Sequence, residues 1–177
     1  MKQYRFEQLS DHPRASLLIV HGLGEHIHRY DDVFDSLNEQ GLNVYGFDHI
    51  GHGQSGGVKG HIDQWSQYTE GLDDAVQWML AADEYPKYIW AHSMGTVITL
   101  DWLQQSPLAS KLNAVALSGP VVEANASPVL ILLAKLLSRV APKLKLSHGL
   151  DINGISSIPS EVERYLADPL VFDRVSA

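Results

Sequence analysis

A serine stands between two small residues in the stretch AHSMG, which runs from Ala91 to Gly95. Apolar residues precede it and helix-compatible residues follow, as in G-x-S-x-G, where a strand turns sharply into a helix and exposes the serine hydroxyl. Alanine replaces the first glycine, but both flanking residues are small enough for a tight turn. Free N–H groups at the head of a helix stabilise developing negative charge. Ser93 is therefore the candidate nucleophile.

Two backbone amides are candidates for stabilising an oxyanion beside this serine. The N–H of Met94 would supply one of them, because it opens the expected helix. The second is expected from an open, glycine-containing loop after an earlier strand, made of His21, Gly22, Leu23 and Gly24. In this loop the N–H of Leu23 is free to point at the same place.

The other polar residues near the serine are expected to support the site. His21 and Glu25 are predicted to shape the loop instead of transferring protons. His92 adjoins Ser93, but neighbouring side chains diverge at a sharp turn. We therefore expect His92 to pack behind the turn; the alternative is that it acts as a base. The simplest competing interpretation is that Ser93 only caps a helix.

Apolar runs and helical stripes alternate along the first 120 residues. Strands are expected at Leu17–Val20, Asn43–Phe47, Lys87–Trp90 and Ala114–Leu117, and helices on the stripes 30–37, 72–80 and 96–105. This alternation predicts an α/β fold with a mostly parallel sheet flanked by helices. Loops 21–28, 48–61 and 91–95 would meet at the carboxyl ends of the strands, where ligands bind in such sheets.

The alternation ceases after Pro120. Residues 127–140 are predicted to form one apolar helix, and the tail after it shows no obvious strand. We interpret 1–120 as the α/β core and 121–177 as a partial cap lying over the sheet. The apolar stripe Val129–Leu137 is either a core helix, the lining of a substrate groove or a surface for docking.

The loop after the second strand permits two other interpretations. Asp48, His49, His52, His61 and Asp63 could form a metal cluster, but the interleaved glycines favour a hydrogen-bonded supporting loop, so no metal is expected. Residues Gly51 to Gly56 read G-x-G-x-x-G after a strand. No helix is expected at the last glycine, so a dinucleotide site is disfavoured, and no cofactor is expected.

Composition excludes several classes of protein. The formal net charge of the 177 residues is -8 without a basic stripe, which argues against nucleic acid as a partner. The absence of cysteine excludes a disulfide framework and suits a cytoplasmic setting. No signal peptide is recognised, and no apolar run approaches the roughly 20 residues of a membrane span. The sequence does not define an oligomeric state.

Four blocks of sequence identify a family. HGLGEHIHRY (21–30), FDHIGHGQSGG (47–57), AHSMG and LSGP (117–120) resemble successive blocks of the monoacylglycerol lipase and lysophospholipase branch of the α/β-hydrolases, also described as serine aminopeptidase S33-like. ADPLVF (167–172) resembles a segment of that family's cap. The resemblance covers about residues 15–120 and specifies the family better than the substrate.

This resemblance implies a serine esterase with an α/β-hydrolase fold. Ser93 would be the nucleophile, and the amides of Leu23 and Met94 would form the oxyanion hole. A lid beginning around Val121 would receive the acyl chain of a lipid-like ester, with peripheral membrane contact through the lid. The family's acid and base follow later strands, in the chain order serine, acid, histidine.

The chain departs from the family in its acid and base. After Ser93 the one histidine is His148, which lies in lid-like sequence, as do Asp151, Glu161, Glu163, Asp168 and Asp173. We therefore expect an N-terminal portion of a hydrolase, without the last strands and weakly active or inactive alone. A non-catalytic module that kept the serine turn, and a peptidase or thioesterase of the same fold, are the alternatives.

Overall fold

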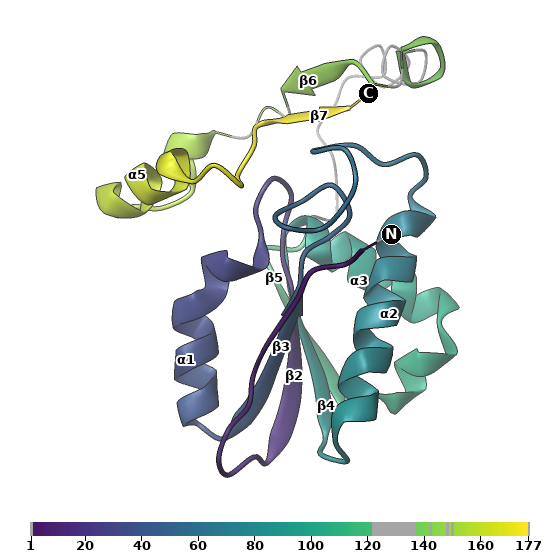
Figure 1. Cartoon of the computed structure of the whole chain (residues 1–177), viewed down its shortest axis with the longest axis vertical. Helices are drawn as coiled ribbons and strands as arrows, with labels where there is room; N and C mark the ends of the chain where they lie inside the picture. The colour runs from purple at the N-terminus through teal and green to yellow at the C-terminus, as the bar shows by residue number, and fades with distance from the viewer. Residues whose placement is uncertain (1, 122–136, 142, 148, 150, 177) are drawn as a thin grey trace.

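A five-stranded sheet with the order β1-β3-β2-β4-β5 forms the centre of the molecule (Figure 1). The computed structural model describes residues 2–121, 137–141, 143–147, 149 and 151–176. β1 pairs antiparallel with β3, and every other pair of neighbours in this sheet is parallel. The strands are β1 (Arg5–Gln8), β2 (Ala15–Val20), β3 (Leu42–Phe47), β4 (Lys87–His92) and β5 (Ala114–Ser118).

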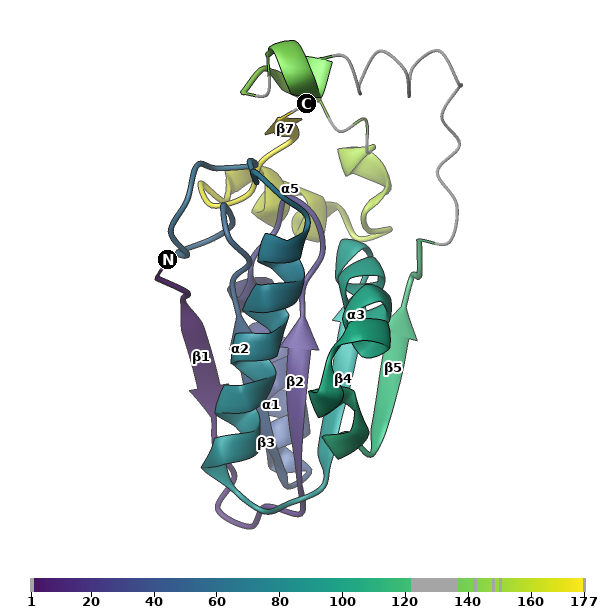
Figure 2. The same cartoon turned by 90° about the vertical axis from the view of Figure 1, so that its right-hand side faces the viewer.

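Helices cover both faces of the sheet. α1 lies on one face, and α2 and α3 lie side by side on the other (Figures 1 and 2). Their bounds are η1 (Ile27–Tyr30), α1 (Asp31–Glu39), α2 (Ser66–Ala82), α3 (Met94–Gln105) and η2 (Pro107–Lys111). The predicted α/β fold, a mostly parallel sheet flanked by helices, is confirmed. In the described part of the chain, no helix has the length and apolarity needed to cross a membrane.

The hydrophobic core is divided into two layers by β2. Leu18 and Val20 face the layer under α2 and α3, whereas Leu17 and Ile19 face the layer under α1. All four are buried, as the continuous apolar run predicted for a strand covered on both faces. Each such side chain contributes about 1.5–3 kcal/mol when fully removed from water.

The crossovers of the chain create a crevice between β2 and β4. The chain leaves β2 toward α1 on one face and leaves β4 toward α3 on the other (Figure 2). Since β2 and β4 are neighbours, their two following loops diverge at one point of the carboxyl edge. Ligands bind at such a switch point in open α/β sheets, so the topology brings the loop at His21 and the turn at Ser93 to one site.

The strands predicted within residues 1–120 agree with the structure within two residues, whereas α2 begins six residues before the predicted stripe. The predicted helix 127–140 lies mostly outside the described residues. The stripe on α2 is buried at Leu72, Ala75, Val76 and Met79. Gly41 ends α1 with φ +82, and its N–H donates to the carbonyl of Asn38 at 2.9 Å, so the predicted C-terminal cap is present.

One strand of the central sheet was not predicted. β1 lies at the edge of the sheet, and its side chains alternate between exposed and half-buried. The four residues Arg5–Gln8 include two charged side chains, so their hydrophobic pattern is too weak and too short to indicate a strand. Pairing with β3, rather than apolar content, defines β1.

The prediction that the tail contains no strand is wrong. β6 (Lys145–Ser147) and β7 (Arg174–Ser176) form a second, antiparallel sheet, joined by η3 (Ile152–Gly154) and α5 (Pro159–Ala167). Strands of three residues are too short for a recognisable alternation. These elements lie above the carboxyl edge of the central sheet (Figure 1). The stripe Val129–Leu137 and His148 fall almost wholly outside the described residues, and the boundary at residue 120 stays a prediction.

A hydrogen-bonded carboxylate joins three elements at the opposite edge of the sheet. Asp83, just after α2, accepts hydrogen bonds from Ser16 Oγ at 2.8 Å, Asn43 Nδ2 at 3.0 Å and Tyr45 OH at 3.3 Å. It also pairs with the buried ammonium of Lys87. Desolvation would raise the pKa of Asp83, but the donors, Lys87 first, lower it to about 2. The pair therefore stays ionised in the folded protein.

Removing the cation from this pair should destabilise the fold. Truncation of one partner leaves a buried charge unpaired, so we expect Lys87→Ala to lower the free energy of unfolding by about 3–5 kcal/mol. The exposed Lys111, whose replacement by alanine should change it by less than about 0.5 kcal/mol, is the control. Urea denaturation at pH 7 measures both, and equal effects would contradict the assignment.

Candidate active site

The turn between β4 and α3 holds Ser93 in a strained conformation. Ser93 has φ 49° and ψ -119°, and among the described residues it alone is a non-glycine with positive φ. Its N–H donates to the carbonyl of Ser118 at 3.0 Å, and its own carbonyl accepts from Thr96 N at 2.9 Å and Thr96 Oγ1 at 2.6 Å. Such backbone strain costs roughly 1–3 kcal/mol and concentrates at functional sites. Hydrogen bonds on both sides maintain it here.

Close packing against β2 explains the glycine two residues after the serine. A Cβ at Gly95 would lie 2.4 Å from the carbonyl oxygen of Val20 and 2.7 Å from that of His21. A Cβ at Gly22 would lie 3.1 Å from the Cβ of Ser93. The turn therefore rests directly on the end of β2 and on the loop that follows it.

The helix-cap interpretation of the serine does not agree with the geometry. Ser93 occupies the N-cap position of α3, yet its side chain makes no capping hydrogen bond. Its hydroxyl is thus not engaged by the helix. The N–H of Met94, the first residue of α3, is one of the amides that an α-helix leaves without an intrahelical partner.

Glu25 braces the loop that follows β2. Its Oε1 accepts the backbone N–H of Gly22 at 2.5 Å and the hydroxyl of Tyr30 at 2.7 Å. Burial and the charge of Glu25 both raise the pKa of Tyr30, which keeps the phenol protonated as a donor. The carboxylate thereby fixes the backbone immediately before Leu23.

Three buried imidazoles lie behind this loop. The backbone N–H of His49 donates to Nε2 of His21 at 3.1 Å, so the proton of His21 resides on Nδ1, which donates to the carbonyl of Gly22 at 2.8 Å. The ring of His21 lies 4.3 Å from that of His49 and 5.4 Å from that of His52, between centroids. His21 thus links the loop after β2 to the loop after β3.

Burial keeps these imidazoles neutral. It lowers the pKa of His21 well below the ordinary value, that of His49 to about 3 and that of His52 to about 4. The neighbouring rings lower the values for His21 and His49 further. A neutral cluster can accept and donate hydrogen bonds without the cost of an unpaired buried charge.

The supporting-loop interpretation accounts for the polar residues after β3. Asp48 accepts the N–H of Ile27 at 2.8 Å and that of Gln54 at 2.7 Å, while Nε2 of His61 lies 3.3 Å from Oδ1 of Asp63. No three His, Cys, Asp or Glu side chains among the described residues are arranged to hold a metal ion. No helix opens at the end of the 51–56 glycine pattern, since α2 begins only at Ser66.

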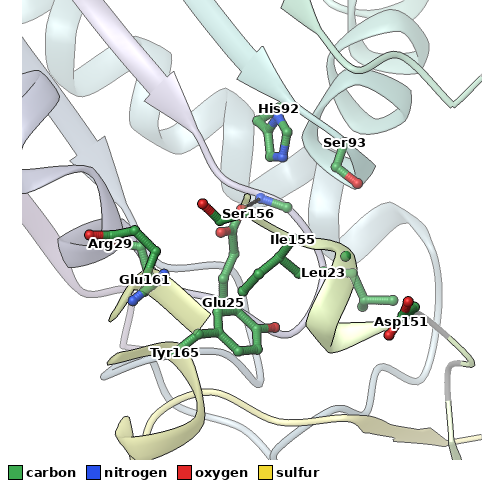
Figure 3. A pocket seen from close by; sticks show the side chains of 12 residues that line it. Leu23, Glu25, Arg29, His92, Ser93, Asp151, Ile155, Ser156, Glu161 and Tyr165 are labelled. Atoms are coloured by element: carbon green, nitrogen blue, oxygen red, sulfur yellow. Dashed lines mark hydrogen bonds between the residues drawn. The ribbon is translucent and has the colours of Figure 1, made fainter. Parts of the chain in front are cut away.

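A cavity of about 420 Å³ opens beside Ser93 (Figure 3). It lies between the loop after β2 and the turn after β4 on one side and the segment containing η3 and α5 on the other. His92 also borders it, with Nδ1 3.3 Å from the hydroxyl of Ser118. Its lining comprises Gly22, Leu23, Glu25, Arg29, His92, Ser93, Asp151, Gly154, Ile155, Ser156, Glu161 and Tyr165. Ser93 and the loop predicted to supply the second amide therefore border one space.

The structure leaves Ser93 without a histidine partner among the described residues. His92 is hydrogen-bonded to Ser118, and His26 lies 2.7 Å from Asp168. His148, the one histidine after the serine, is outside the described residues. The cavity residues that sequence reasoning missed are Arg29 and those of the 151–165 segment. The block HGLGEHIHRY contains Arg29, but nothing in the pattern of the tail placed the others near Ser93.

The sheet order and the strained serine turn at its switch point define an α/β-hydrolase. Residues 11–177 match the family described as serine aminopeptidase, S33, and the chain belongs to that family. The family resemblance in the sequence is thus confirmed.

Several similar proteins are named as lipases. Monoacylglycerol lipase of Mycolicibacterium smegmatis is 37% identical over 164 residues, covering 90% of this chain and 57% of that protein. Monoglyceride lipase of Rattus norvegicus is 32% identical over 171 residues, covering 94% and 55%. The crystal structure of Paleococcus ferrophilus monoacylglycerol lipase superposes with a TM-score of 0.85 at 34% identity, covering 99% and 66%. The chain therefore spans 55–66% of the length of these relatives.

Acid should destabilise the protein through the buried imidazoles. In the unfolded chain, His49 and His52 bind protons once the pH falls below the ordinary imidazole pKa of 6.5. In the folded protein they stay neutral until the pH approaches their lowered pKa values, about 3 for His49 and about 4 for His52. Their contribution to stability is thus complete above pH 6.5 and declines as the pH falls, by up to about 1.4 kcal/mol per pH unit for each residue. We expect His52→Gln to flatten the dependence of unfolding free energy on pH between 6.5 and 4.5.

The exposed His12 provides the control for this measurement. His12→Gln should leave the slope from urea denaturation unchanged. A slope that responds equally to both substitutions, or to neither, would contradict the neutral cluster.

Proposed function

We propose that the protein is a serine hydrolase that cleaves carboxylic esters of lipid-like substrates, a monoacylglycerol or a lysophospholipid. The observation that carries the proposal is the strained turn at Ser93, which presents an uncapped hydroxyl at a 420 Å³ cavity. The naming of similar proteins as monoacylglycerol lipases supports the choice of substrate.

In the proposed reaction, the hydroxyl of Ser93 attacks the ester carbonyl carbon and passes its proton to a base outside the described residues. The carbonyl oxygen becomes an oxyanion, which the N–H groups of Leu23 and Met94 stabilise. The C–O bond to the alcohol then breaks, the alcohol leaves with the proton, and an acyl-enzyme remains. Water hydrolyses this ester in the second half of the reaction and restores the serine.

The other proposed site residues act on the loop. His21 and Glu25 hold the backbone around Leu23 through Gly22, and Gly24 supplies a positive φ of 74° directly after it. Gly95 lets the serine turn approach β2. His92 packs beside the turn, with its hydrogen bond to Ser118. None of these side chains needs to transfer a proton.

A non-catalytic binding module is the second candidate. It is favoured by one observation, that no histidine among the described residues hydrogen-bonds the hydroxyl of Ser93. The two candidates differ in whether the serine is activated. A peptidase or thioesterase of the same fold would share that activation, and rates on acyl esters against peptides and thioesters would separate them from the ester hydrolase.

We also propose a cytoplasmic protein that touches membranes peripherally through the cap. Val140, Leu144 and Leu146 are 75%, 46% and 41% exposed, and Lys143 and Lys145 lie exposed among them. Cations interleaved with apolar side chains suit an anionic lipid surface, in contrast to the chain's net charge of -8.

Fluorophosphonate labelling tests the nucleophile. These reagents phosphonylate activated serines, with fluoride as the leaving group. We therefore expect the full-length protein to be labelled at Ser93, with Ser93→Ala losing at least about 100-fold in labelling and in ester hydrolysis. Ser110→Ala, an exposed serine in η2, is the matched control and should behave as the parent. If the folded, unsubstituted protein is not labelled, or if labelling persists in Ser93→Ala, the proposal of a serine hydrolase is refuted and the non-catalytic binding module is favoured.

Vesicle sedimentation tests the membrane contact. Each basic residue near an anionic surface contributes about 1 kcal/mol, so Lys143→Gln combined with Lys145→Gln should weaken binding to phosphatidylserine-containing vesicles by about 10-fold or more. The exposed pair Lys2 and Lys111, changed likewise, should have little effect. Equal binding of all variants to neutral and anionic vesicles would exclude the proposed surface.

A further inference from the structure

Residues 165–176, here called the docked segment, contact the loops that follow β2 and β3. Hydrogen bonds between distant parts of the chain hold the segment there. The N–H of Phe172 donates to the carbonyl of Gly24 at 3.0 Å. The ammonium of Lys59 donates to the carbonyl of Pro169 at 2.7 Å. The segment therefore contacts both the loop after β2 and the loop after β3.

Further contacts extend this attachment to both ends of the segment. The N–H of Ser176 donates to the carbonyl of Gly60 at 2.8 Å, and its hydroxyl lies 2.8 Å from Nδ1 of His61. At the other end, the guanidinium of Arg29 lies 5.0 Å from the ring centre of Tyr165. The docked segment is thus attached near both of its ends and at Pro169 and Phe172 between them.

Two hydrogen bonds restrain the ends of the loop 22–27, one of them within the loop and the other from Asp48 after β3. Glu25 accepts the N–H of Gly22, and Asp48 accepts the N–H of Ile27 at 2.8 Å. These restraints hold the two ends of the loop. In the middle of the loop, Glu25 is held by the hydroxyl of Tyr30, and Gly24 and His26 on either side of it have partners in the docked segment.

The docked segment supplies two further restraints on that middle part. Phe172 binds the carbonyl of Gly24, and Oδ2 of Asp168 lies 2.7 Å from Nε2 of His26. Both anchors lie within three residues of Leu23. Figure 3 shows Leu23 and Tyr165 at the same cavity, so the segment and the amide of interest border one space.

The bond between His26 and Asp168 is well protected from water. The side chains are 5% and 20% exposed. Desolvation would raise the pKa of Asp168, but hydrogen bonds from His26 and from the N–H of Leu170 lower it below the usual value. The carboxylate is therefore ionised and can only accept, so Nε2–H of His26 is the donor.

We infer that Asp168 is a positioning residue, which acts through His26 to hold the loop 22–27 with the amide of Leu23 directed at the oxyanion. The inference rests on the proposed function and deepens it, because it makes docking of the cap a condition for a complete oxyanion hole. The cap would then regulate the rate of the chemical step in addition to covering the substrate.

A positioning role has a distinct kinetic consequence. An oxyanion donor acts mainly in the transition state, so its displacement lowers kcat and leaves KM almost unchanged. Loss of a donor costs roughly 100- to 1000-fold in kcat. A loop released at one anchor and still held at its other anchors should lose less, and we expect about 10-fold.

Asp168→Ala in the full-length protein tests the inference by two readouts. Hydrogen–deuterium exchange of peptides covering 22–27 should become several-fold faster, and kcat for a short-chain ester should fall about 10-fold with KM within 2-fold. Asp168→Asn keeps a hydrogen-bond acceptor for His26 and for Leu170, so it should recover most of both losses. In the double variant with His26→Phe, Asp168→Ala should cause no further loss, since the two residues act as one unit.

Asp173→Ala is the matched control, because Asp173 is an exposed carboxylate in the same segment. It should change neither readout. Unchanged exchange in Asp168→Ala, or faster exchange with an unchanged kcat, would overturn the inference. If the parent shows neither ester hydrolysis nor labelling of Ser93, the proposed function fails, whereas the exchange measurement still decides whether Asp168 holds the loop.

Discussion

The contact between the start of α3 and the end of β2 is the constraint on which the rest of the site depends. Gly95 lies so close to the carbonyl oxygens of Val20 and His21 that no side chain fits between them. At this separation the chain turns from β4 into α3 within one residue, and Ser93 takes the positive φ. The same contact brings the loop after β2 within reach of the serine. One close approach of backbone therefore places both halves of the site.

The two edges of the sheet carry opposite kinds of polar chemistry. At one edge, Asp83 and Lys87 are ionised, and the carboxylate is surrounded by donors that satisfy it. At the catalytic edge, the imidazoles of His21, His49 and His52 are buried in neutral form. The neutral imidazoles thus support the loops from within the protein, whereas charged side chains, among them Glu25, Arg29 and Glu161, border the cavity beside Ser93.

Much of the fold and part of the site could be predicted from the sequence. The strand at Leu17–Val20 was predictable because burial on both faces demands an unbroken apolar run. Ser93, Leu23 and Met94 could be placed together because parallel strands bring their following loops to one edge. The edge strand β1 and the short strands β6 and β7 could not, since they are defined by pairing partners and not by their own apolar pattern.

The residues of the 151–176 segment near the cavity could not be predicted from sequence patterns, for a related reason. Asp168 contacts His26, and Tyr165 contacts Arg29. Each is a single contact between distant residues, which leaves no periodic signal in a sequence. Only the short resemblance of ADPLVF to a cap segment marked this region. Nothing in that resemblance indicated the partner of Asp168.

The docked segment also has a consequence for the order in which the protein folds. The bond between His26 and Asp168 closes a loop of 142 residues, whereas β2, α1 and β3 assemble from neighbouring sequence. Closing so long a loop has a large entropic cost, so contacts this distant along the chain form late in folding. During synthesis they cannot form until the segment has left the ribosome. The sheet and the serine turn can therefore exist before the loop beside them has its final restraint. A newly made chain would pass through a period in which its sheet is folded but its loop beside Ser93 is not yet held in place for catalysis.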